Sequence, residues 1–463
     1  MKKNQLLSLS FCFLSVPFFS AVAQKSAEGF VYSSEKGVTF GAISDNGKWI
    51  VGNASVDAMD KYPTLWDVTK NEAVSLAPTE DYVCGVHDVS DDGCVVGLIE
   101  GDFFTGKPAY YKNGTWHQLP IPEGYTGGCV RSVTPDGKIM MGHIVKYPGG
   151  GMVGYEMVMV KWVDGVLTTF EAPADKFGTK SKNDLVIGVS TDGTKFAGHL
   201  AMSILPDLTP FFYENGEWSL IGDEIYQRED NLSVLEIMGM SPDLKWITGH
   251  IEYDTYYEQD EYGAWSIFRH FVYNTETKEL ILDLKEGPAG MGTTITKEGV
   301  HFIGCPHNYP IRQAYLKIPG DDVYYNMPQY ISQEYNFDVQ TIGCSDFGTV
   351  CGISEDGKTV FGFDAPGNNW ILKLSEPILP SGGAAINRIH RDSETRNAYM
   401  YGRDLMINGD VQSFVLLTPD GRSLMNAEYT GEPVSLSGLN PGVYMVVLKG
   451  KSGDVSNAKI VIR

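Results

Sequence analysis

One short phrase recurs seven times between Gly41 and Gly362. Each copy has a Ser or Thr, an acidic residue and, in six copies, a Gly, followed by a strand-like run that a second Gly closes. The copies run from Ser44 to Gly52, Ser90 to Gly97, Thr134 to Gly142, Ser190 to Gly198, Ser241 to Gly249, Thr296 to Gly304 and Ser354 to Gly362. A unit that recurs at roughly 45 to 58 residues has the period of propeller blades. The repeat therefore predicts an all-β, seven-bladed β-propeller.

Each phrase is predicted to be a hairpin between the first two strands of a blade. Gly adopts φ > 0 without steric cost, and Asp or Ser side chains bond back to the backbone of a turn. A second hairpin follows in several units, at Asn113-Gly114, Asp164-Gly165 and Asn215-Gly216. Two hairpins make four strands, which is one blade. The second Gly of each phrase lies inside a strand and predicts close backbone approach from the neighbouring blade.

The seventh unit lacks a fourth strand, because the chain turns Pro-rich from Glu376 to Pro380 after a strand near Trp370 to Leu374. The apolar segment from Phe30 to Tyr32 precedes the first phrase and can supply that strand. Closing the ring with a strand from the far end of the chain removes exposed sheet edges.

Two segments resemble known families. The phrases Thr134 to Lys138 and Ser241 to Asp243 resemble the Ser-Pro-Asp-Gly repeats of Tol-system propellers, and the fuller pattern resembles the HAF extracellular repeat. The C-terminal segments Leu416 to Arg422, Leu436 to Val446 and Lys459 to Arg463 resemble the C-terminal sorting domain of type IX secretion cargo in Bacteroidetes. That resemblance implies a small C-terminal β-sandwich, the type IX export machinery as a partner, and a location outside the cell or on the outer-membrane surface. The family's usual Pro-Asn-Pro at the start of this domain is absent here.

The N-terminus is typical of a secretory signal, with Lys2 and Lys3, an apolar core from Leu6 to Phe19, and small residues before Gln24. The apolar stretch is too short for a membrane span, so we expect no transmembrane segment. The predicted domains are a signal peptide at 1–23, the propeller at 24–376, a linker at 377–390 and the sorting domain at 391–463.

The charge lies mainly on the predicted propeller. Removing residues 1–23 takes away two lysines and no acids, so the formal net charge changes from −22 to −24. Residues 388–463 hold nine Lys and Arg against eight Asp and Glu. A field of this sign argues against nucleic acid as a partner and is compatible with neutral glycans, cations or basic proteins. It is equally compatible with simple solubility of a surface protein.

Six cysteines remain after the signal, and an even count in an exported protein permits disulfides. Cys344 and Cys351 are the best candidate pair, because a turn from Asp346 to Thr349 would place them opposite each other across a hairpin.

Three consecutive units place a His directly after the second Gly, at His143, His199 and His250. Equivalent positions on neighbouring blades share a height on the ring, so these imidazoles are candidate ligands of a divalent cation. The alternative is ordinary packing between blades. Apart from such a cation, the sequence indicates no cofactor.

The strongest candidate for ligand binding is the long connection from Glu252 to Trp265, which we expect to be a loop between the second and third strands of its blade. Its aromatic residues are Tyr253, Tyr256, Tyr257, Tyr262 and Trp265, accompanied by five acids. Aromatic rings stack on sugars, and carboxylates hold hydroxyls or cations. The alternative is a solvated loop whose tyrosines fold onto the blade.

Three functions fit these features. The first is a secreted or surface-displayed, non-catalytic binding propeller that recognises a glycan or a protein through the Glu252 to Trp265 connection. The second is a carbohydrate-active enzyme, a glycoside hydrolase or lyase, on the same scaffold, although no two carboxylates are singled out as a catalytic pair. The third is a structural component of the cell surface. No catalytic residue is identified from the sequence.

Overall fold

The computed structural model describes residues 25–462 except 34, 57–58, 80–81, 150–154, 174–183, 201–208, 223–231, 261–262, 283–287, 289, 305–312, 322, 345–346, 365, 381–396, 402, 409–410, 419–421, 432 and 451–454. Strands dominate this part of the chain. Its helices are α2 (Met327–Tyr335) and the short 3-10 helix η1 (Val339–Ile342). The predicted signal peptide lies outside the described residues. Within them, no helix is long and apolar enough to cross a membrane.

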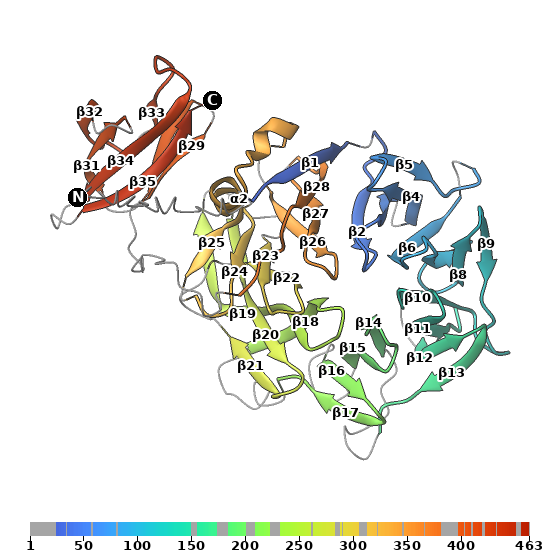
Figure 1. Ribbon diagram of the computed structural model, residues 1–463. Coiled ribbons are helices and arrows are strands. Elements are labelled where there is room, and N and C mark those ends of the chain that lie inside the picture. Colours follow the sequence, from blue (N-terminus) through green and yellow to red (C-terminus); the bar gives the residue numbers. More distant parts are fainter. Residues whose placement is uncertain are drawn as a thin grey trace, which may run out of the picture.

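Between Ala27 and Leu374 the described strands form seven four-stranded antiparallel sheets, arranged in a ring (Figure 1). Six of them follow the chain order. Their strands are β2 (Thr39–Ile43), β3 (Trp49–Val56), β4 (Met59–Asp67) and β5 (Glu72–Ser75); β6 (Cys84–Val89), β7 (Val95–Ile99), β8 (Lys107–Lys112) and β9 (Thr115–Gln118); β10 (Gly127–Val133), β11 (Ile139–Lys146), β12 (Glu156–Val163) and β13 (Val166–Phe170); β14 (Leu185–Val189), β15 (Lys195–Leu200), β16 (Thr209–Glu214) and β17 (Glu217–Leu220); β18 (Leu232–Met240), β19 (Trp246–Asp260), β20 (Gly263–Asn274) and β21 (Glu279–Leu282); and β22 (Met291–Ile295), β23 (His301–Gly304), β24 (Tyr315–Lys317) and β25 (Tyr324–Asn326). This is a β-propeller, as the repeat predicts.

The remaining sheet joins the two ends of the ring. It contains β26 (Thr349–Ile353), β27 (Thr359–Phe363) and β28 (Asn369–Leu374), and its fourth strand is β1 (Ala27–Tyr32). Tyr32 is opposite Asn369 in the register, and Ala27 is opposite Leu374. The prediction that the segment around Phe30 supplies the missing strand is therefore confirmed. The pairing ties together segments that are more than three hundred residues apart in the chain.

The repeated phrase forms the turn between the first two strands of each sheet. Its Ser or Thr is buried in all seven copies. Ser44 Oγ accepts a hydrogen bond from Trp49 N at 3.0 Å, and Gly47 N donates to Ser44 O at 2.8 Å. In six copies the hydroxyl also pairs with the acid or amide two residues later, at 2.6 to 2.8 Å. The side chains of the phrase thus supply the hydrogen bonds that their own turn needs, which explains why the phrase recurs.

The second hairpins have the predicted turn chemistry. Asn113, Asp164 and Asn215 have φ values of 53°, 49° and 52°, and the Gly after each is also left-handed. Two consecutive residues with φ > 0 are the requirement of a type I′ turn, which Asn-Gly and Asp-Gly meet at least cost.

The prediction for the second Gly of each phrase was wrong about the neighbour at six of the seven positions; only at Gly304 is the nearest atom on the adjacent sheet, Thr349 Cγ2 at 2.8 Å from the added Cβ. A Cβ at Gly142 would overlap Cys129 O, which belongs to the first strand of the same sheet. Gly52, Gly97, Gly198, Gly249 and Gly362 meet the carbonyl oxygen of their own first strand in the same way. The crowding arises because each first strand contains a β-bulge at this point, which pushes its backbone onto the second strand.

The C-terminal segment forms two further sheets. One contains β29 (Asn397–Tyr401), β30 (Asp404–Asn408) and β33 (Val434–Ser435), and the other contains β31 (Val411–Leu417), β32 (Ser423–Glu428), β34 (Gly442–Gly450) and β35 (Val455–Ile462). Both sheets contribute to one hydrophobic core, in which Leu405 and Ile407 pack with Phe414, Val446 and Leu448. This core is separate from the clusters between the sheets of the ring.

Candidate functional site

The phrase turns lie side by side around one end of the ring. The residue after each Ser or Thr takes part in contacts between successive turns. Glu355 N donates to Asp45 O at 2.8 Å, and Asn46 N donates to Asp91 Oδ1 at 2.8 Å. Asp91 N donates to Pro135 O, and Lys297 Nζ lies 4.0 Å from Glu355 Oε1. We call this set of phrase turns, most of which contact the next turn along the ring, the hairpin collar.

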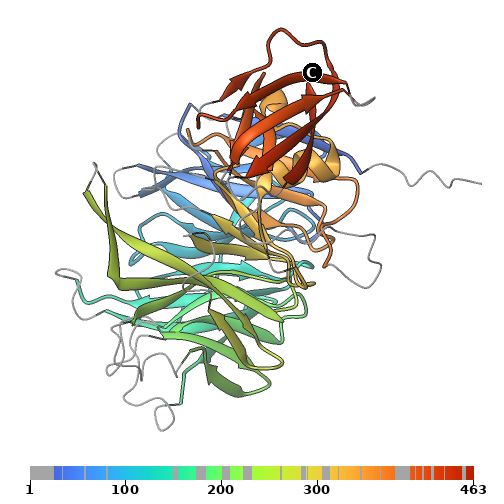
Figure 2. The ribbon, with the colours of Figure 1, turned by 90° about the vertical axis from the view of Figure 1, so that its left-hand side faces the viewer.

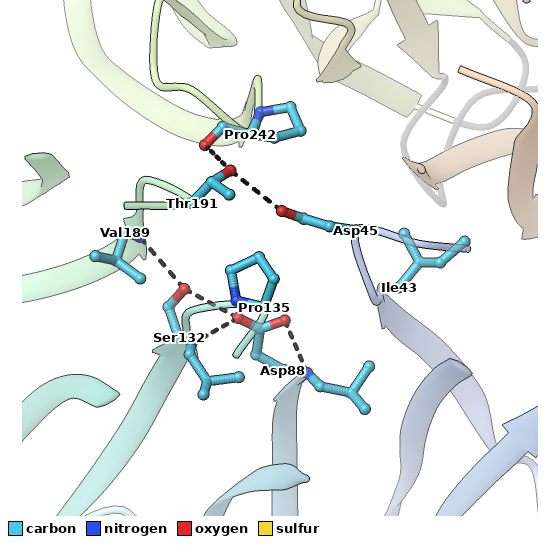
Figure 3. A pocket seen from close by; sticks show the side chains of 10 residues that line it. Ile43, Asp45, Asp88, Ser132, Pro135, Val189, Thr191 and Pro242 are labelled. Atoms are coloured by element: carbon cyan, nitrogen blue, oxygen red, sulfur yellow. Dashed lines mark hydrogen bonds between the residues drawn. The ribbon is translucent and has the colours of Figure 1, made fainter. Parts of the chain in front are cut away.

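A pocket of about 60 Å³ opens inside this collar (Figure 3). Its lining comes from four of the turns and from the first strands behind them: Ile43, Asp45, Asp88, Val89, Ser132, Val133, Pro135, Val189, Thr191 and Pro242. The volume is sufficient for one or two water molecules and is far below the several hundred Å³ of a typical small-molecule site.

Asp88 anchors the inner side of this pocket. Its Oδ2 accepts hydrogen bonds from Ser132 Oγ and Val133 N, both at 2.9 Å, and its Oδ1 accepts from Val89 N at 2.8 Å. Ser132 Oγ in turn accepts from Val189 N at 3.3 Å. The carboxyl group thus links the first strands of three successive sheets, a structural role that occupies both of its oxygens.

Asp45 faces the pocket from the opposite side in Figure 3. Thr191 Oγ1 lies 3.1 Å from Asp45 Oδ2 and 3.0 Å from Pro242 O. A hydroxyl carries one proton and can donate it to one acceptor at a time. The Thr191 hydroxyl therefore shares its one proton between Asp45 Oδ2 and Pro242 O.

Both carboxyl groups have raised pKa values. Burial raises the pKa of Asp45 to about 6, the hydrogen bond from Thr191 opposes this shift, and the charges of Asp91 and Glu355 add to it. Burial raises the pKa of Asp88 to about 7 against the effect of its three hydrogen bonds, and the charge of Asp45 contributes. Two interacting acids with pKa values near neutrality give this pocket an unusual electrostatic character.

The three predicted histidine ligands do not form a metal site. His199 Nε2 accepts a hydrogen bond from Ile237 N of the next sheet at 2.9 Å, so its lone pair is already used. His143 is fully buried, with its ring 5.1 Å from that of Phe103, and His250 Nε2 lies 3.5 Å from Glu236 Oε2. Among the described residues, no three His, Cys, Asp or Glu side chains could hold a metal ion together. The positions diverge around the ring, and the imidazoles pack between sheets instead.

Burial dominates the titration of these imidazoles. It lowers the pKa of His143 to about 3 and the pKa values of His199 and His250 to about 4 each. All three are therefore neutral at physiological pH, as their packing requires.

The predicted disulfide is absent from the structure. Cys351 is a free thiol, and no disulfide joins it to Cys344. Cys344 follows η1 and its Sγ lies 3.7 Å from Asp364 Oδ2, whereas Cys351 is on β26. The hairpin that the prediction required does not form, because β26 pairs with β27 as the first strand of its sheet and Cys344 is not part of a paired strand. Cys84, Cys94 and Cys129 are also free.

The aromatic connection from Glu252 to Trp265 is a ribbon of two strands where the sequence predicted a loop. Tyr253, Tyr256 and Tyr257 lie on β19 and Trp265 lies on β20, while Tyr262 falls outside the described residues. Pairing continues to Asp260 opposite Gly263, after a register shift between Tyr253 and Tyr257. The tyrosines of this segment favour a strand, but its many acidic residues are typical of a loop, and for that reason the sequence predicted a loop.

This ribbon extends beyond its neighbours. In the described pairings, β18 accompanies β19 only as far as Tyr253, and β21 accompanies β20 only from Phe271 to Asn274. Figure 2 shows the hairpin as the long yellow-green pair of strands. We call the part from Tyr256 to Ser266 the β19–β20 ribbon. Glu258 and Trp265 are opposite each other in its register.

Comparisons with known proteins identify no family for this chain. No family model matches the chain, and no curated protein matches it. Solved structures that are similar include an oligogalacturonate lyase in complex with manganese, which is 10% identical with a TM-score of 0.48 and aligns over 76% of this chain and 98% of that chain. TolB from Acinetobacter baumannii is 9% identical, with a TM-score of 0.35 over 74% of this chain and 65% of its own. YCF48 bound to D1 peptide is 14% identical, with a TM-score of 0.38 over 75% and 96%.

Proposed function

We propose that this protein is a non-catalytic binding module, displayed outside the cell, that recognises a neutral glycan or a basic protein through the β19–β20 ribbon. The observation that carries the proposal is the ribbon itself. Strand β19 has 15 residues and β20 has 12, whereas the other second and third strands of the ring have 3 to 9. A two-stranded ribbon is marginally stable alone, so its length needs a functional reason.

The composition of the ribbon region supports the same proposal. From Glu252 to Trp265 the sequence has four tyrosines, one tryptophan and five acids, and no Lys or Arg occurs before Arg269. Aromatic side chains dominate the energetics of recognition surfaces, and an acidic field steers basic or neutral partners toward them. The ligand class remains glycan or protein within this proposal.

The remaining parts of the proposal concern architecture and export. We propose that the seven sheets are the complete set of blades, and that residues 391–463 form a type IX sorting domain of the β-sandwich type. The shared core of the two C-terminal sheets supports the sandwich. Deleting residues 391–463 in the native bacterium is expected to leave the propeller in the periplasm, and fractionation of cells checks this.

A carbohydrate-active enzyme is a second candidate, which the raised pKa values of Asp45 and Asp88 favour. The volume of about 60 Å³ between them opposes it, because a sugar ring does not fit there. Both oxygens of Asp88 are also engaged in structural hydrogen bonds. We therefore assign these carboxyl groups to the hydrogen-bonded structure around the pocket.

The test is binding to an array of neutral oligosaccharides and to immobilised lysozyme as a basic protein. The test variant replaces Tyr256, Tyr257 and Trp265 with Ala. The matched control replaces Val74, Val166 and Ile281, exposed apolar residues on outer strands, with Ala. We expect at least a tenfold loss of affinity in the ribbon variant and none in the control. Equal binding by both variants would remove the ribbon as the site.

A further inference from the structure

A β-bulge occurs at one equivalent position in the first strand of all seven sheets of the ring. In each case the register skips the residue three positions before the Ser or Thr of the phrase. The bulged residues, in ring order, are Gly41, His87, Arg131, Ile187, Met238, Thr293 and Cys351. Bulges re-aim side chains and are frequent beside functional sites.

The bulged residues face the centre of the ring. Each is at least partly exposed, although the residue before it is buried in every strand. Met238, for example, is 43% exposed beside Ile237 at 2%. The first strands contact one another around the ring, β2 with β6, β6 with β10 and β26 with β2. The first strands therefore surround the middle of the ring, which we call the central channel. Their bulged residues are exposed to this channel.

On one side of the channel the bulges carry a cation and a hydrogen-bonding ring. Arg131 Nη1 lies 3.4 Å from His87 Nδ1. The guanidinium always donates, so Nδ1 accepts and the neutral imidazole carries its proton on Nε2. Burial and the charge of Arg131 hold the pKa of His87 well below its usual range, which keeps the ring neutral.

This pair has unused donors. Arg131 Nε and His87 Nε2 are buried without a hydrogen-bond partner in the described structure. Asp60 lies near Arg131: burial raises the pKa of the Asp60 carboxyl, and the charge of Arg131 opposes part of that rise. Asp60 Oδ1 accepts a hydrogen bond from Asn53 Nδ2 at 3.0 Å. Buried donors without acceptors are costly, and an anionic ligand would supply the acceptors.

The adjoining bulges supply a different surface. Ile187 and Met238, on the two sheets after Arg131, are apolar and partly exposed. On the other side of His87, the bulge of the first sheet is Gly41, and a Cβ built there would have no atom within 4 Å. The channel is therefore open beside Gly41, with a cationic side and an apolar side at the same level.

We propose that the central channel binds a small organic carboxylate at the level of the bulges, with its carboxylate on Arg131 and His87 and its apolar part against Ile187 and Met238. Guanidinium and imidazole N–H groups are suited to a carboxylate. The apolar part of the ligand would replace water on the exposed side chains of Ile187 and Met238. This site is distinct from the β19–β20 ribbon and does not depend on its function.

The probe is sodium hexanoate, titrated into the whole chain by calorimetry, with hexanamide as the uncharged comparison. We expect saturable binding of hexanoate and at least tenfold weaker binding of hexanamide. Arg131→Met is expected to weaken hexanoate at least tenfold. Arg422→Met removes one positive charge from an exposed turn of the C-terminal sheets and is expected to bind as the original chain does.

Gly41→Leu tests the same site without touching a polar group. Gly41 does not have a left-handed φ and faces open space, so Leu is accommodated and projects into the channel. This variant is expected to keep its unfolding midpoint and lose hexanoate binding. No saturable binding of hexanoate by the original chain, or undiminished binding by Gly41→Leu, would overturn the proposal even if Arg131→Met failed to fold.

Discussion

Thr191 Oγ1 lies 3.1 Å from Asp45 Oδ2, although 146 residues separate the two in the chain. The contact joins the turn of the first sheet to that of the fourth across the pocket, so the hairpin collar is linked across its centre as well as around its rim. A carboxyl group held there beside Asp91 and Glu355 is sensitive to pH, which leads to the first prediction.

Asp45→Asn is expected to stabilise the protein at pH 8 by about 1 to 2 kcal/mol. The folded-state pKa of Asp45 is about 6, above its usual value of 3.8, so the native state binds the proton more tightly than the unfolded chain does. Its contribution is therefore fully favourable below about pH 4 and is lost as pH rises through 6. Urea unfolding between pH 4 and 8 should give a flatter profile for the variant. Asp164→Asn, the same change in an exposed turn, is expected to leave the profile unchanged.

Gly142→Ala is expected to destabilise the protein by at least about 3 kcal/mol. The new Cβ would overlap Cys129 O, and backbone cannot move aside as a side chain can. Gly438→Ala is the matched control, because a Cβ there has no atom within 4 Å. Thermal unfolding of the two variants measures the difference. Similar midpoints would show that the bulged strand does not press on this glycine.

Tyr32→Ala is expected to lower the free energy of unfolding by about 2 to 4 kcal/mol. The Tyr32 ring lies 5.4 Å from Phe40 and 5.5 Å from Trp66, so it joins the closing strand to the first sheet. Tyr32→Phe retains the ring and should remain near the original stability. Hydrogen exchange on β28 reports the same event, since its edge is protected by β1. Unchanged exchange in Tyr32→Ala would argue that the ring closes elsewhere.

Thiol titration checks the cysteine assignment. In denaturant without reductant, the original chain is expected to show two more reactive thiols than a Cys344→Ala, Cys351→Ala variant. Equal counts would mean that the two cysteines are paired after all. In the folded protein at pH 8 the reaction should be slow, because burial raises the pKa of Cys351 to about 12 and those of Cys94 and Cys129 to about 11.

The local chemistry of the repeat made most of the ring predictable. Ser44, Asn113 and Gly114 act through contacts within a few residues, and such contacts are visible in sequence. The pairing of Tyr32 with Asn369 was also foreseeable, because one strand was missing at the far end of the chain.

Features that depend on long-range geometry were not predictable. The contact between Asp45 and Thr191, the bulges at His87 and Arg131, and the environment of His199 depend on which sheets are adjacent and on the curvature of their first strands. The bulges did have a signal, since each lies three residues before the phrase Ser or Thr. The polar residues His87 and Arg131 at this position are the trace that sequence reasoning missed.

The most direct test of the binding proposal is the unfolding midpoint of the whole chain with and without saturating neutral oligosaccharide or lysozyme. A ligand that binds only the native state stabilises it, by about 2.7 kcal/mol at one hundred times its Kd. We expect the midpoint to rise with one of these ligands and the rise to vanish when Tyr256, Tyr257 and Trp265 are replaced with Ala. A midpoint that no ligand moves, or a rise that persists in that variant, would contradict the account.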